Sequence, residues 1–300
     1  MIILGAGLSG LICAALNAQA QVYERNPSDF VSHRAVLRFR DDKIARALGL
    51  TFRKVTVRKA IWFHGKEVVP TPRIANLYSQ KVRSVIAENS IWNIAHSERF
   101  IAPDDLHQIL ADICGDRVHW DTDITSKMLR DLLDRSSIIS TIPILFLLKL
   151  LGIETSLTFN YQSITVYRYR VPGCDVFQTV YYPDPEQGIY RATLTGDLLT
   201  VESSGGNEHF AEVGLAFGID SKLFMSATAP HRQSFGKIAP VDDGARKALL
   251  HRLTQEFGVY SLGRFAVWRN ILLDDVFEDI ASIRRMITQS HYDNTLEMTK

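Results

Sequence analysis

The chain begins with Met1-Ile2-Ile3-Leu4-Gly5-Ala6-Gly7-Leu8-Ser9-Gly10-Leu11. The residues before Gly5 form an apolar run that is typical of a short buried strand, and the stretch from Gly5 to Gly10 fits the pattern G-x-G-x-x-G. In this pattern Gly5 permits a tight turn, Gly7 lets the backbone approach a pyrophosphate, and Gly10 lets the following helix pack closely on the strand. That helix begins with Leu8 and Ser9, whose free N–H groups attract phosphates.

The residues after this motif favour a dinucleotide site over a glycine-rich turn that only packs tightly. A helix of small residues is expected at 12–16, and a second strand at 21–23 ends in Glu24. Glu24 lies 19 residues after Gly5, the distance at which a carboxylate accepts hydrogen bonds from ribose hydroxyls. Because a carboxylate repels a 2′-phosphate, NADP is disfavoured, and FAD and NAD remain as ligands.

Composition and charge exclude several classes of protein. The chain has 300 residues, of which 46% are hydrophobic and 22% charged, so a disordered chain, a collagen and a coiled-coil rod are excluded. The near balance of 34 Lys and Arg against 33 Asp and Glu argues against a protein that binds polyanions through bulk charge. No apolar run is long enough to span a bilayer, so we expect no membrane association.

The cysteines and histidines predict neither a metal site nor a hydrolase. Cys13, Cys114 and Cys174 are too widely spaced for a zinc site or a disulfide framework, which suits a reducing cytoplasm. The histidines are scattered singly, and no Ser-His-Asp arrangement is evident. We therefore expect no metal and a cytoplasmic location.

The opening motif, together with Val22-Tyr23-Glu24-Arg25-Asn26, resembles the FAD-binding opening of a large flavoprotein superfamily. Its members include amine oxidases, protoporphyrinogen oxidase, phytoene desaturases and UDP-galactopyranose mutase. In that superfamily the acid is usually Glu and is often followed by a basic residue, a position that Arg25 fills. The resemblance implies FAD as the cofactor and an α/β fold. That fold has a Rossmann-like FAD-binding domain of the glutathione-reductase type, with an inserted antiparallel β-sheet substrate domain.

A strand expected at 136–142 carries the same resemblance. It stops at Pro143 and resembles the superfamily segment in which a strand ending Thr-x-Pro returns near the adenosine or the flavin. The resemblance therefore assigns Thr141 and Pro143 to the cofactor site. The alternative is an ordinary buried strand followed by a helix that begins with proline.

Residues 263–269, Gly-Arg-Phe-Ala-Val-Trp-Arg, resemble the C-terminal flavin motif of UDP-galactopyranose mutases. There a Gly-Arg turn passes the flavin and a helix begins just after it, which implies cofactor contacts from Gly263, Arg264, Leu273 and Asp274. A helix that starts near Asp274 would stabilise the negative charge of a reduced flavin with its N-terminus. The sequence departs from the mutases, which carry a tyrosine-rich stretch where this chain has Trp268, Asn270, Leu272 and Leu273, and this departure argues against binding of a nucleotide-sugar diphosphate.

The basic stretch from His33 to Arg40 occupies the place where relatives run a strand under the flavin ring. Alternation places Val36, Arg38 and Arg40 on one face of such a strand. The resemblance implies that His33 or Arg38 faces the flavin. A basic strand that faces solvent is an equal alternative.

Positive charge is concentrated between residues 31 and 90. This segment holds 13 Lys and Arg against 4 acids, whereas the whole chain has a net charge of +1. Such asymmetry indicates an anionic partner, with DNA as one candidate, and a solvated basic face is the alternative. The basic residues are Arg34, Arg38, Arg40, Lys43, Arg46, Arg53, Lys54, Arg58, Lys59, Lys66, Arg73, Lys81 and Arg83.

The pattern of the chain predicts two domains that interrupt each other. Residues 163–203 alternate between polar and apolar side chains with short turns, which predicts an antiparallel sheet. The apolar run at 144–151 predicts a buried helix. The FAD-binding domain is expected to comprise residues 1–54, 102–152 and 236–300, and the substrate domain residues 55–101 and 153–235.

Few side chains are needed for catalysis, because a flavin carries the chemistry itself. Arg191 lies in a segment that resembles the mutase and desaturase strand carrying a substrate-side arginine, where it would bind a carboxylate or phosphate. The alternative for Arg191 is an ion pair across the sheet. Lys237 is a candidate for the lysine that amine oxidases place near flavin N5, and His33 is the third catalytic candidate.

These resemblances lead to three hypotheses of different classes. The first is an FAD-dependent oxidoreductase of the amine-oxidase type, in which a hydride passes from a C–H next to nitrogen to flavin N5. The short chain and its basic segment also resemble bacteriophage flavoproteins that oxidise a glycyl-modified thymine in DNA, which would place the protein in the host cytoplasm. The alternatives are a non-redox enzyme like UDP-galactopyranose mutase and a non-enzymatic nucleotide-binding module. The substrate, the electron acceptor and the oligomeric state stay open.

Overall fold

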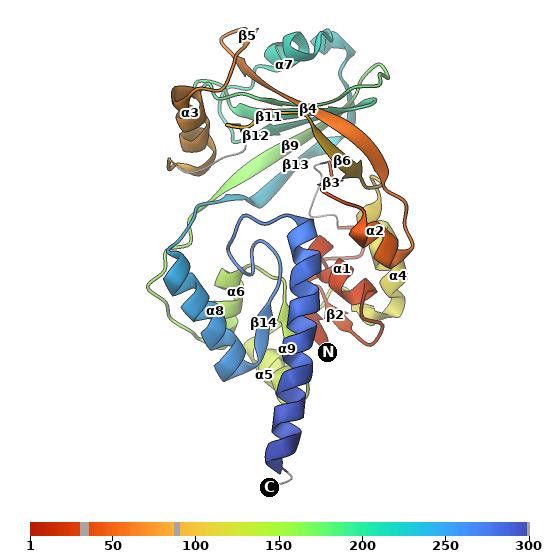
Figure 1. The fold of residues 1–300 in the computed structure, drawn as a ribbon, viewed down its shortest axis with the longest axis vertical. Coiled ribbons are helices and arrows are strands. Elements are labelled where there is room, and N and C mark those ends of the chain that lie inside the picture. The colour runs from red at the N-terminus through yellow and green to blue at the C-terminus, as the bar shows by residue number, and fades with distance from the viewer. Residues whose placement is uncertain (31–35, 87–90, 299–300) are drawn as a thin grey trace.

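The computed structural model describes residues 1–30, 36–86 and 91–298. It is an α/β fold with two sheets stacked along the long axis of the molecule, which we call the lower and the upper sheet after their positions in Figure 1. The expected fold class is therefore confirmed. His33 lies outside the described residues.

The lower sheet is five-stranded and wholly parallel. In chain order its strands are β1 (Ile2–Leu4), β2 (Gln21–Tyr23), β7 (Val118–His119), β8 (Ile138–Ser140) and β14 (Val259–Ser261). Their order in space is β14-β8-β1-β2-β7, so β1 lies between the second and the fourth strand of the chain order. This is the strand order of dinucleotide-binding folds, and the order reverses between β1 and β8.

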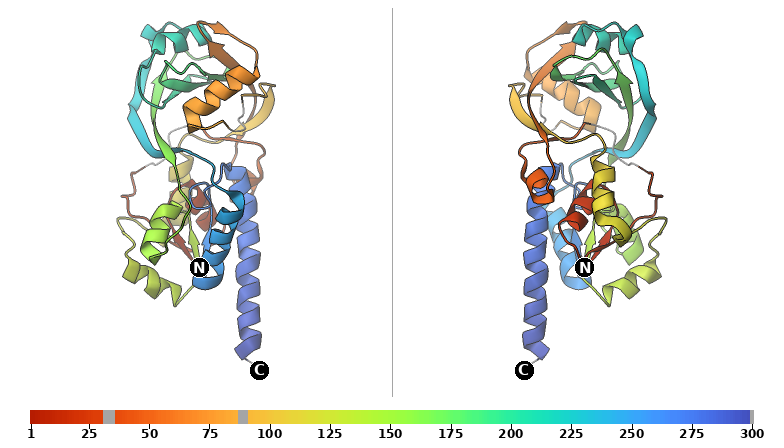
Figure 2. Two further views of the ribbon diagram at one scale, coloured as in Figure 1. Left: turned by 90° about the vertical axis from the view of Figure 1, so that its left-hand side faces the viewer. Right: turned by 90° about the vertical axis from the view of Figure 1, so that its right-hand side faces the viewer.

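Helices cover both faces of the lower sheet. On one side, Ile3 packs with side chains of α1 (Leu8–Ala15), α4 (Leu106–Cys114) and α9 (Leu273–Met298). On the other side, Ile2 and Leu4 pack with α5 (Ser126–Leu133), α6 (Ile144–Leu151) and α8 (Asp243–Phe257). The alternation of side chains along β1 thus divides the core between two helical layers. Figure 2 shows that α9 continues past the sheet.

Local sequence signals explain where several helices begin and end. The Thr125 hydroxyl accepts a hydrogen bond from Met128 N–H at 3.2 Å and caps α5, and Asp242 caps α8 through Ala245 N–H at 2.7 Å. Gly152 and Gly258 adopt left-handed conformations, with φ values of 67° and 64°, and end α6 and α8.

The upper sheet is nine-stranded and mostly antiparallel. The main path runs β13-β9-β12-β11-β10-β4-β6-β3, and β5 pairs with β4. The β10–β4 pair is parallel, which the expected antiparallel sheet did not include. The strands are β3 (Arg38–Phe39), β4 (Arg53–Phe63), β5 (Lys66–Glu67), β6 (Ser97–Ile101), β9 (Tyr161–Arg170), β10 (Phe177–Tyr181), β11 (Ile189–Thr195), β12 (Leu198–Ser203) and β13 (Met225–Ile238).

Two helices cover the upper sheet, one on each face. α7 (Phe210–Phe217) packs on the face that carries Leu199 and Val201. α3 (Pro72–Arg83) packs on the opposite face, against Ile61 and Tyr181. Short elements complete the chain: the helix α2 (Lys43–Leu48) and the 3-10 turns η1 (Gly115–Arg117) and η2 (Ser221–Leu223).

Most of the expected elements are present. The helix predicted at 144–151 is α6, and it is buried on one side against the lower sheet. The strand expected over 33–40 is limited, among the described residues, to Arg38–Phe39, which pairs with β6 of the upper sheet. The sequence analysis did not predict α3, α5 or β14. In the part of the chain that the structure describes, no helix is both long and apolar enough to cross a bilayer.

Candidate functional site

The glycine-rich turn connects β1 to α1 at the point where the strand order reverses. Gly5 has a φ of 96°, a conformation that side chains disfavour. A Cβ on Gly10 would lie 2.0 Å from the carbonyl oxygen of Gly5, so only glycine allows α1 to pack this closely on the turn. Thr141, which follows β8, donates its hydroxyl hydrogen to Leu4 O at 2.8 Å. The ends of β1 and β8 are thereby held together at the reversal.

Gly7 differs from the other two glycines of the motif. Among the described residues, a Cβ at Gly7 would meet no atom within 4 Å, so these residues leave open space at the N-terminus of α1. Gly7 is the N-cap of that helix and has no side-chain cap. The first N–H groups of a helix lack partners within it and carry its positive dipole end. The turn therefore has the space and the donors that a pyrophosphate requires.

Glu24 is held beside this turn at the end of β2. One carboxylate oxygen accepts a hydrogen bond from Ala6 N–H at 2.7 Å, and the other accepts Asn26 N–H at 2.9 Å. The half-exposed carboxylate is thus fixed at the place where a ribose would lie if a dinucleotide bound. Arg25 instead lies over the Phe146 ring of α6, with its guanidinium carbon 5.5 Å from the ring centre.

The turn after β14 crosses the start of α1. Gly263 has a φ of 88°, and a Cβ there would lie 2.6 Å from Ser9 Oγ. The predicted Gly-Arg turn therefore lies directly against the glycine-rich turn, although more than 250 residues separate them in the chain. The next residue, Arg264, donates to Asn270 Oδ1 at 2.6 Å. Burial lowers the pKa of Arg264 to about 10.

Asp274 is the second residue of α9 and is hydrogen-bonded to the segment after β3. Its Oδ1 accepts a hydrogen bond from Arg40 N–H at 2.8 Å, and the Arg40 side chain forms ion pairs with Asp274 and Asp275. Leu273 is half-buried and packs on the core beneath α1. The predicted helix start is therefore present, and its acids are bound to Arg40.

The second group of candidates lies on the upper sheet. Arg191 of β11 forms a two-pronged pair with Glu202 of the neighbouring β12, in which Nη2 donates to Oε1 at 2.7 Å. Tyr190 also donates its hydroxyl hydrogen to Glu202, at 3.2 Å. The cross-sheet ion pair expected as the alternative for Arg191 is thus present, and a cation held in this way also remains able to contact a ligand.

Lys237 lies next to this group. Its Nζ is 4.6 Å from the centre of the Tyr190 ring. Burial and the positive charges of Arg191 and Arg264 lower the pKa of Lys237 well below its usual value, while Glu202 opposes the shift. The geometry therefore places a lysine with a lowered pKa beside Tyr190 and Arg191.

Arg38 lies on β3, at one edge of the upper sheet, and its side chain reaches β10 and β11 of the same sheet. It donates to the hydroxyls of Thr179 at 2.8 Å and Thr195 at 3.0 Å. Burial, together with the charge of Arg191, lowers the pKa of Arg38 to about 10. The side chain thus links three strands of the upper sheet.

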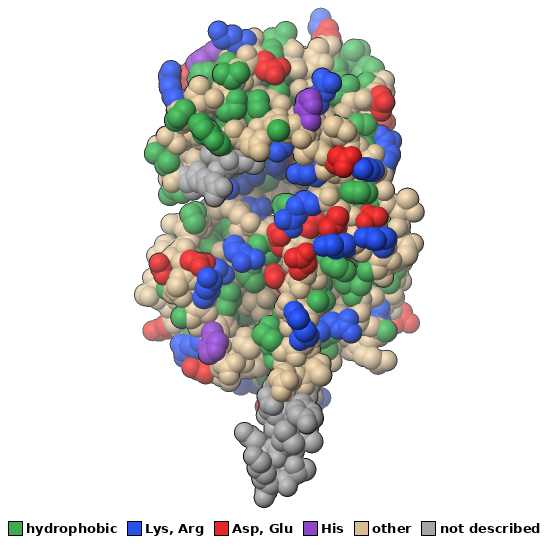
Figure 3. Space-filling view, viewed as in Figure 1, with side chains coloured by type: hydrophobic (Ala, Val, Ile, Leu, Met, Phe, Trp, Pro, Cys, Tyr) green, Lys and Arg blue, Asp and Glu red, His purple; other side chains and the backbone are tan. Residues whose placement is uncertain are grey.

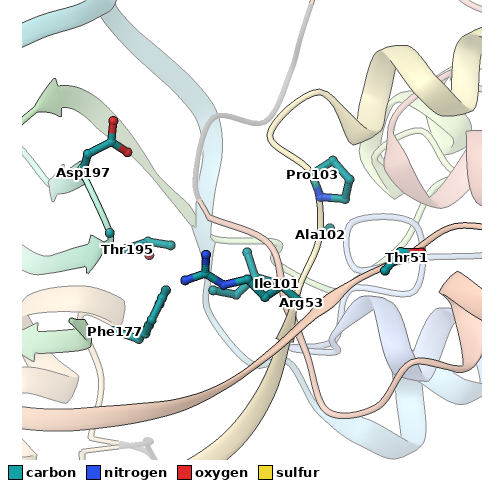
Figure 4. A pocket seen from close by; sticks show the side chains of 9 residues that line it. Thr51, Arg53, Ile101, Ala102, Pro103, Phe177, Thr195 and Asp197 are labelled. Carbon is teal, nitrogen blue, oxygen red and sulfur yellow. The ribbon is translucent and has the colours of Figure 1, made fainter. Parts of the chain in front are cut away.

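A pocket of about 330 Å³ adjoins Arg38 and is shown in Figure 4. Thr195 lines the pocket and also accepts the hydrogen bond from Arg38. Arg53 lies over the Phe177 ring at 4.6 Å and extends toward Thr195. The remaining lining residues are Thr51, Ile101, Ala102, Pro103, Gly196 and Asp197.

Two groups of candidates are therefore assembled from distant parts of the chain. The lower group surrounds the glycine-rich turn, and the upper group comprises Arg38, Arg191 and Lys237. Figure 3 shows a hollow between the two halves of the molecule with Lys and Arg side chains in it. No group of His, Cys, Asp or Glu in the described ranges has the arrangement of a metal site.

Glu202 and Tyr190 were not predicted as site residues. Glu202 is the only acid in the otherwise neutral strand β12 and is 4% exposed. An isolated acid in a buried strand signals a partner cation, but its sequence position does not show that the cation is Arg191.

Solved structures of other proteins have a similar fold. A structure of reduced UDP-galactopyranose mutase matches with a TM-score of 0.60 and 13% sequence identity, over 89% of this chain and 89% of the mutase chain. PqsL, a probable FAD-dependent monooxygenase from Pseudomonas aeruginosa, matches with a TM-score of 0.52 and 11% identity, over 98% of this chain and 86% of that chain. Likeness at such low identity shows the fold. No protein-family profile and no curated protein sequence matches this chain.

Proposed function

We propose that the protein is an FAD-dependent oxidoreductase of the amine-oxidase type. The observation that carries the proposal is the open space at Gly7, framed by the N-terminus of α1 and the Glu24 carboxylate where the strand order reverses. Crevices at this position of parallel sheets bind dinucleotides. The similar fold of a probable FAD-dependent monooxygenase supports FAD, and not NAD, as the dinucleotide of this protein.

The residues present fit the parts of FAD. Glu24 would accept the ribose hydroxyls, and the turn at Gly7 with Leu8 and Ser9 would hold the pyrophosphate. Thr141, Pro143, Gly263 and Arg264 belong to the turns that follow β8 and β14, next to the glycine-rich turn. Bound FAD would supply N5 as the acceptor of a hydride from a C–H bond next to nitrogen, and the resulting imine would hydrolyse in water.

Lys237 and Arg191 would act on the substrate side. An amine is oxidised as the neutral base, because its nitrogen lone pair must be free. Lys237, whose pKa is lowered by burial and by Arg191, would accept a proton from a substrate ammonium group. Arg191 would hold the substrate, since Glu202 fixes its guanidinium. His33 stays a catalytic prediction outside the described residues.

A narrower form of the proposal is that the amine belongs to a glycyl-modified thymine in the DNA of a bacteriophage. The basic segment at 31–90 supports it. The charge available to DNA is smaller than the sequence count, because acids pair with Arg40, Arg46 and Lys54. Duplex DNA binding that weakens steeply with salt would support this form, and absence of binding at low salt would exclude it.

One specific observation favours a second candidate, a non-redox mutase: the fold matches UDP-galactopyranose mutase over most of both chains. Against it stands the turn that departs from the mutase motif. Trp268 of this turn is buried, and its indole N–H donates to Ala239 O at 3.0 Å. Trp268 is thus part of the core.

The test is the visible spectrum of the purified protein under anaerobic conditions. We expect the flavin band to bleach on addition of an amine, an amino acid or glycyl-modified DNA, and to bleach more slowly in Lys237→Met with the oxidised spectrum unchanged. A flavin that stays oxidised with every amine, in a protein that binds UDP-galactose after reduction with dithionite, would instead identify the mutase. A bound flavin that responds to neither class of compound would indicate a non-enzymatic module.

A further inference from the structure

One face of the upper sheet is apolar in one part and polar in another. Where α3 covers the face, it is apolar: Ile61, Val166 and Tyr181 pack with Tyr78 and Val82 of the helix. Beyond α3 the same face carries hydroxyl and cationic side chains and turns toward the lower sheet (Figure 1). Polar side chains on a buried sheet face need partners, so this part of the face requires an explanation that core packing does not give.

The polar side chains form a row across the strands. Strand register places Thr179 opposite Thr193, Thr193 opposite Thr200, and Thr200 opposite Arg168. Directly opposite residues on a shared face have Cβ atoms about 4.5–5.5 Å apart, so the row is continuous. At one end Thr179 accepts the hydrogen bond from Arg38, and its hydroxyl oxygen is 3.3 Å from that of Thr193.

The other end of the row has unused donors. Thr200 is 2% exposed, and its hydroxyl has no hydrogen-bond partner among the described residues. Arg168, directly opposite, donates from Nη2 to Asp104 Oδ2 at 2.9 Å. Its Nε is buried and, in the same described ranges, also lacks a partner. Two neighbouring buried donors thus lack an acceptor among the described residues.

The charge of the surroundings defines that acceptor. Glu202 is engaged by Arg191, and Asp104 is about half exposed at the rim. The cations on this side of the hollow therefore exceed the acids, as the Lys and Arg side chains in Figure 3 illustrate. These cations are Arg38, Arg168, Arg191 and Arg264. A water molecule would accept the two hydrogen bonds, but it would not offset the positive charge.

We infer that Thr200 and Arg168 form an anion subsite, in which a carboxylate or phosphate group of the substrate accepts hydrogen bonds from Thr200 Oγ1 and Arg168 Nε. The inference rests on the proposed function and narrows its substrate from any amine to one that carries an acidic group. The subsite is separate from the place for the FAD pyrophosphate. Gly7 follows β1 of the lower sheet, whereas Thr200 and Arg168 lie on strands of the upper sheet.

The experiment measures binding, so that it does not depend on flavin reduction. The purified protein is titrated by calorimetry with inorganic phosphate, with acetate and with acetamide, the neutral counterpart of acetate. We expect phosphate or acetate to bind and acetamide not to bind, and the stronger anion identifies the substrate's acidic group. Thr200→Val, which keeps the side-chain shape, and Arg168→Met should each weaken anion binding about tenfold or more.

Arg170→Met is the matched control. Arg170 lies two residues along the same strand, and its ion pair with Asp197 is exposed. This variant should bind anions and FAD as the wild type does. Anion binding that is equal in wild type, Thr200→Val and Arg168→Met would overturn the inference, as would a wild type that binds neither anion. A loss of FAD affinity in Thr200→Val would overturn it too, because the donors would then serve the cofactor. Circular dichroism confirms that each variant is folded.

Different results would contradict the proposed oxidoreductase and the anion subsite. If the protein contains no flavin but binds acetate through Thr200, the proposed oxidoreductase is wrong and the anion subsite stands. If amines reduce the flavin with equal efficiency whether or not they carry an acid, and the anions do not bind, the subsite is wrong and the oxidoreductase stands.

Discussion

The lower and the upper sheet face the same hollow but specify their functional residues in different ways. In the lower sheet the decisive feature is the absence of side chains: Gly10 admits the backbone of Gly5, and Gly7 leaves space open. In the upper sheet the decisive features are side chains, such as Arg191 held by Glu202. The cofactor half thus depends on backbone conformation within one short segment, and the substrate half on side chains that distant strands bring together.

We expect the largest loss of stability from a substitution at Gly10. In Gly10→Val the new side chain would collide with Gly5 O, since even a Cβ would lie 2.0 Å from it. We expect a loss of several kcal/mol, at or above the upper end of the about 1–3 kcal/mol typical of overpacking, so that little folded protein is recovered. Chemical denaturation followed by circular dichroism measures it. A variant as stable as wild type would show that α1 can shift away from β1.

In the upper sheet, the next largest effect is expected from Arg191→Met. Glu202 is 4% exposed, and removal of its cation leaves a buried carboxylate without its charge partner. We expect a loss of about 3 kcal/mol in the free energy of unfolding. Arg191→Met combined with Glu202→Leu is the control, because replacing both partners by apolar residues should recover most of the loss. If the double variant is no better than the single one, the pair acts through packing and not through charge.

Gly7→Ala separates the effect of the glycine motif on stability from its effect on FAD binding. Gly7 has a φ of −66°, which alanine adopts readily, and its Cβ would meet no atom of the described residues within 4 Å. The cofactor-free protein should therefore keep its stability or gain about 0.5 kcal/mol. The methyl group would occupy the space that the described residues leave open at Gly7, so we expect FAD affinity to fall about tenfold or more. Thermal melts and FAD titrations measure the two effects, and unchanged FAD affinity would place the pyrophosphate elsewhere.

The smallest expected effect is a change in pH dependence. The pKa of Lys237 is lowered in the folded protein, so the unfolded chain binds the proton more tightly. Stability from this group therefore rises with pH between its folded pKa and about 10.5, the value of a free lysine. Lys237→Met should lack this rise and be more stable than wild type at low pH. Denaturation midpoints across pH measure the difference, and parallel curves would show that Lys237 is not perturbed.

The cofactor half could be predicted from the sequence because its signals are local. The spacing from Gly5 to Glu24 lies within one strand–helix–strand unit, and the structure places Glu24 beside the turn. The Gly263 turn was found by resemblance, and its contact with Ser9 supports that resemblance. Their contacts with a cofactor stay predictions.

The substrate half could be predicted only in part. Alternation indicated the strands, but not the register that aligns Thr200 with Arg168. These residues lie on β12 and β9, which are neighbours in the sheet but are not consecutive in the chain. Arg38 was expected near the flavin, which stays a prediction, and the structure shows that it donates a hydrogen bond to Thr179 of the same sheet. The domain boundaries stay a prediction, and β3 shows the difficulty, since it belongs to the first predicted segment and pairs with the upper sheet.

The central claim is that the lower sheet binds FAD, and the cofactor content of the purified protein tests it most directly. The wild type and Gly7→Ala are purified side by side, incubated with FAD and separated from the free flavin, and the bound nucleotide is released and identified by chromatography. We expect one FAD for each wild-type chain and less for Gly7→Ala. A folded wild-type protein that retains no FAD, or that retains NAD in its place, would contradict it.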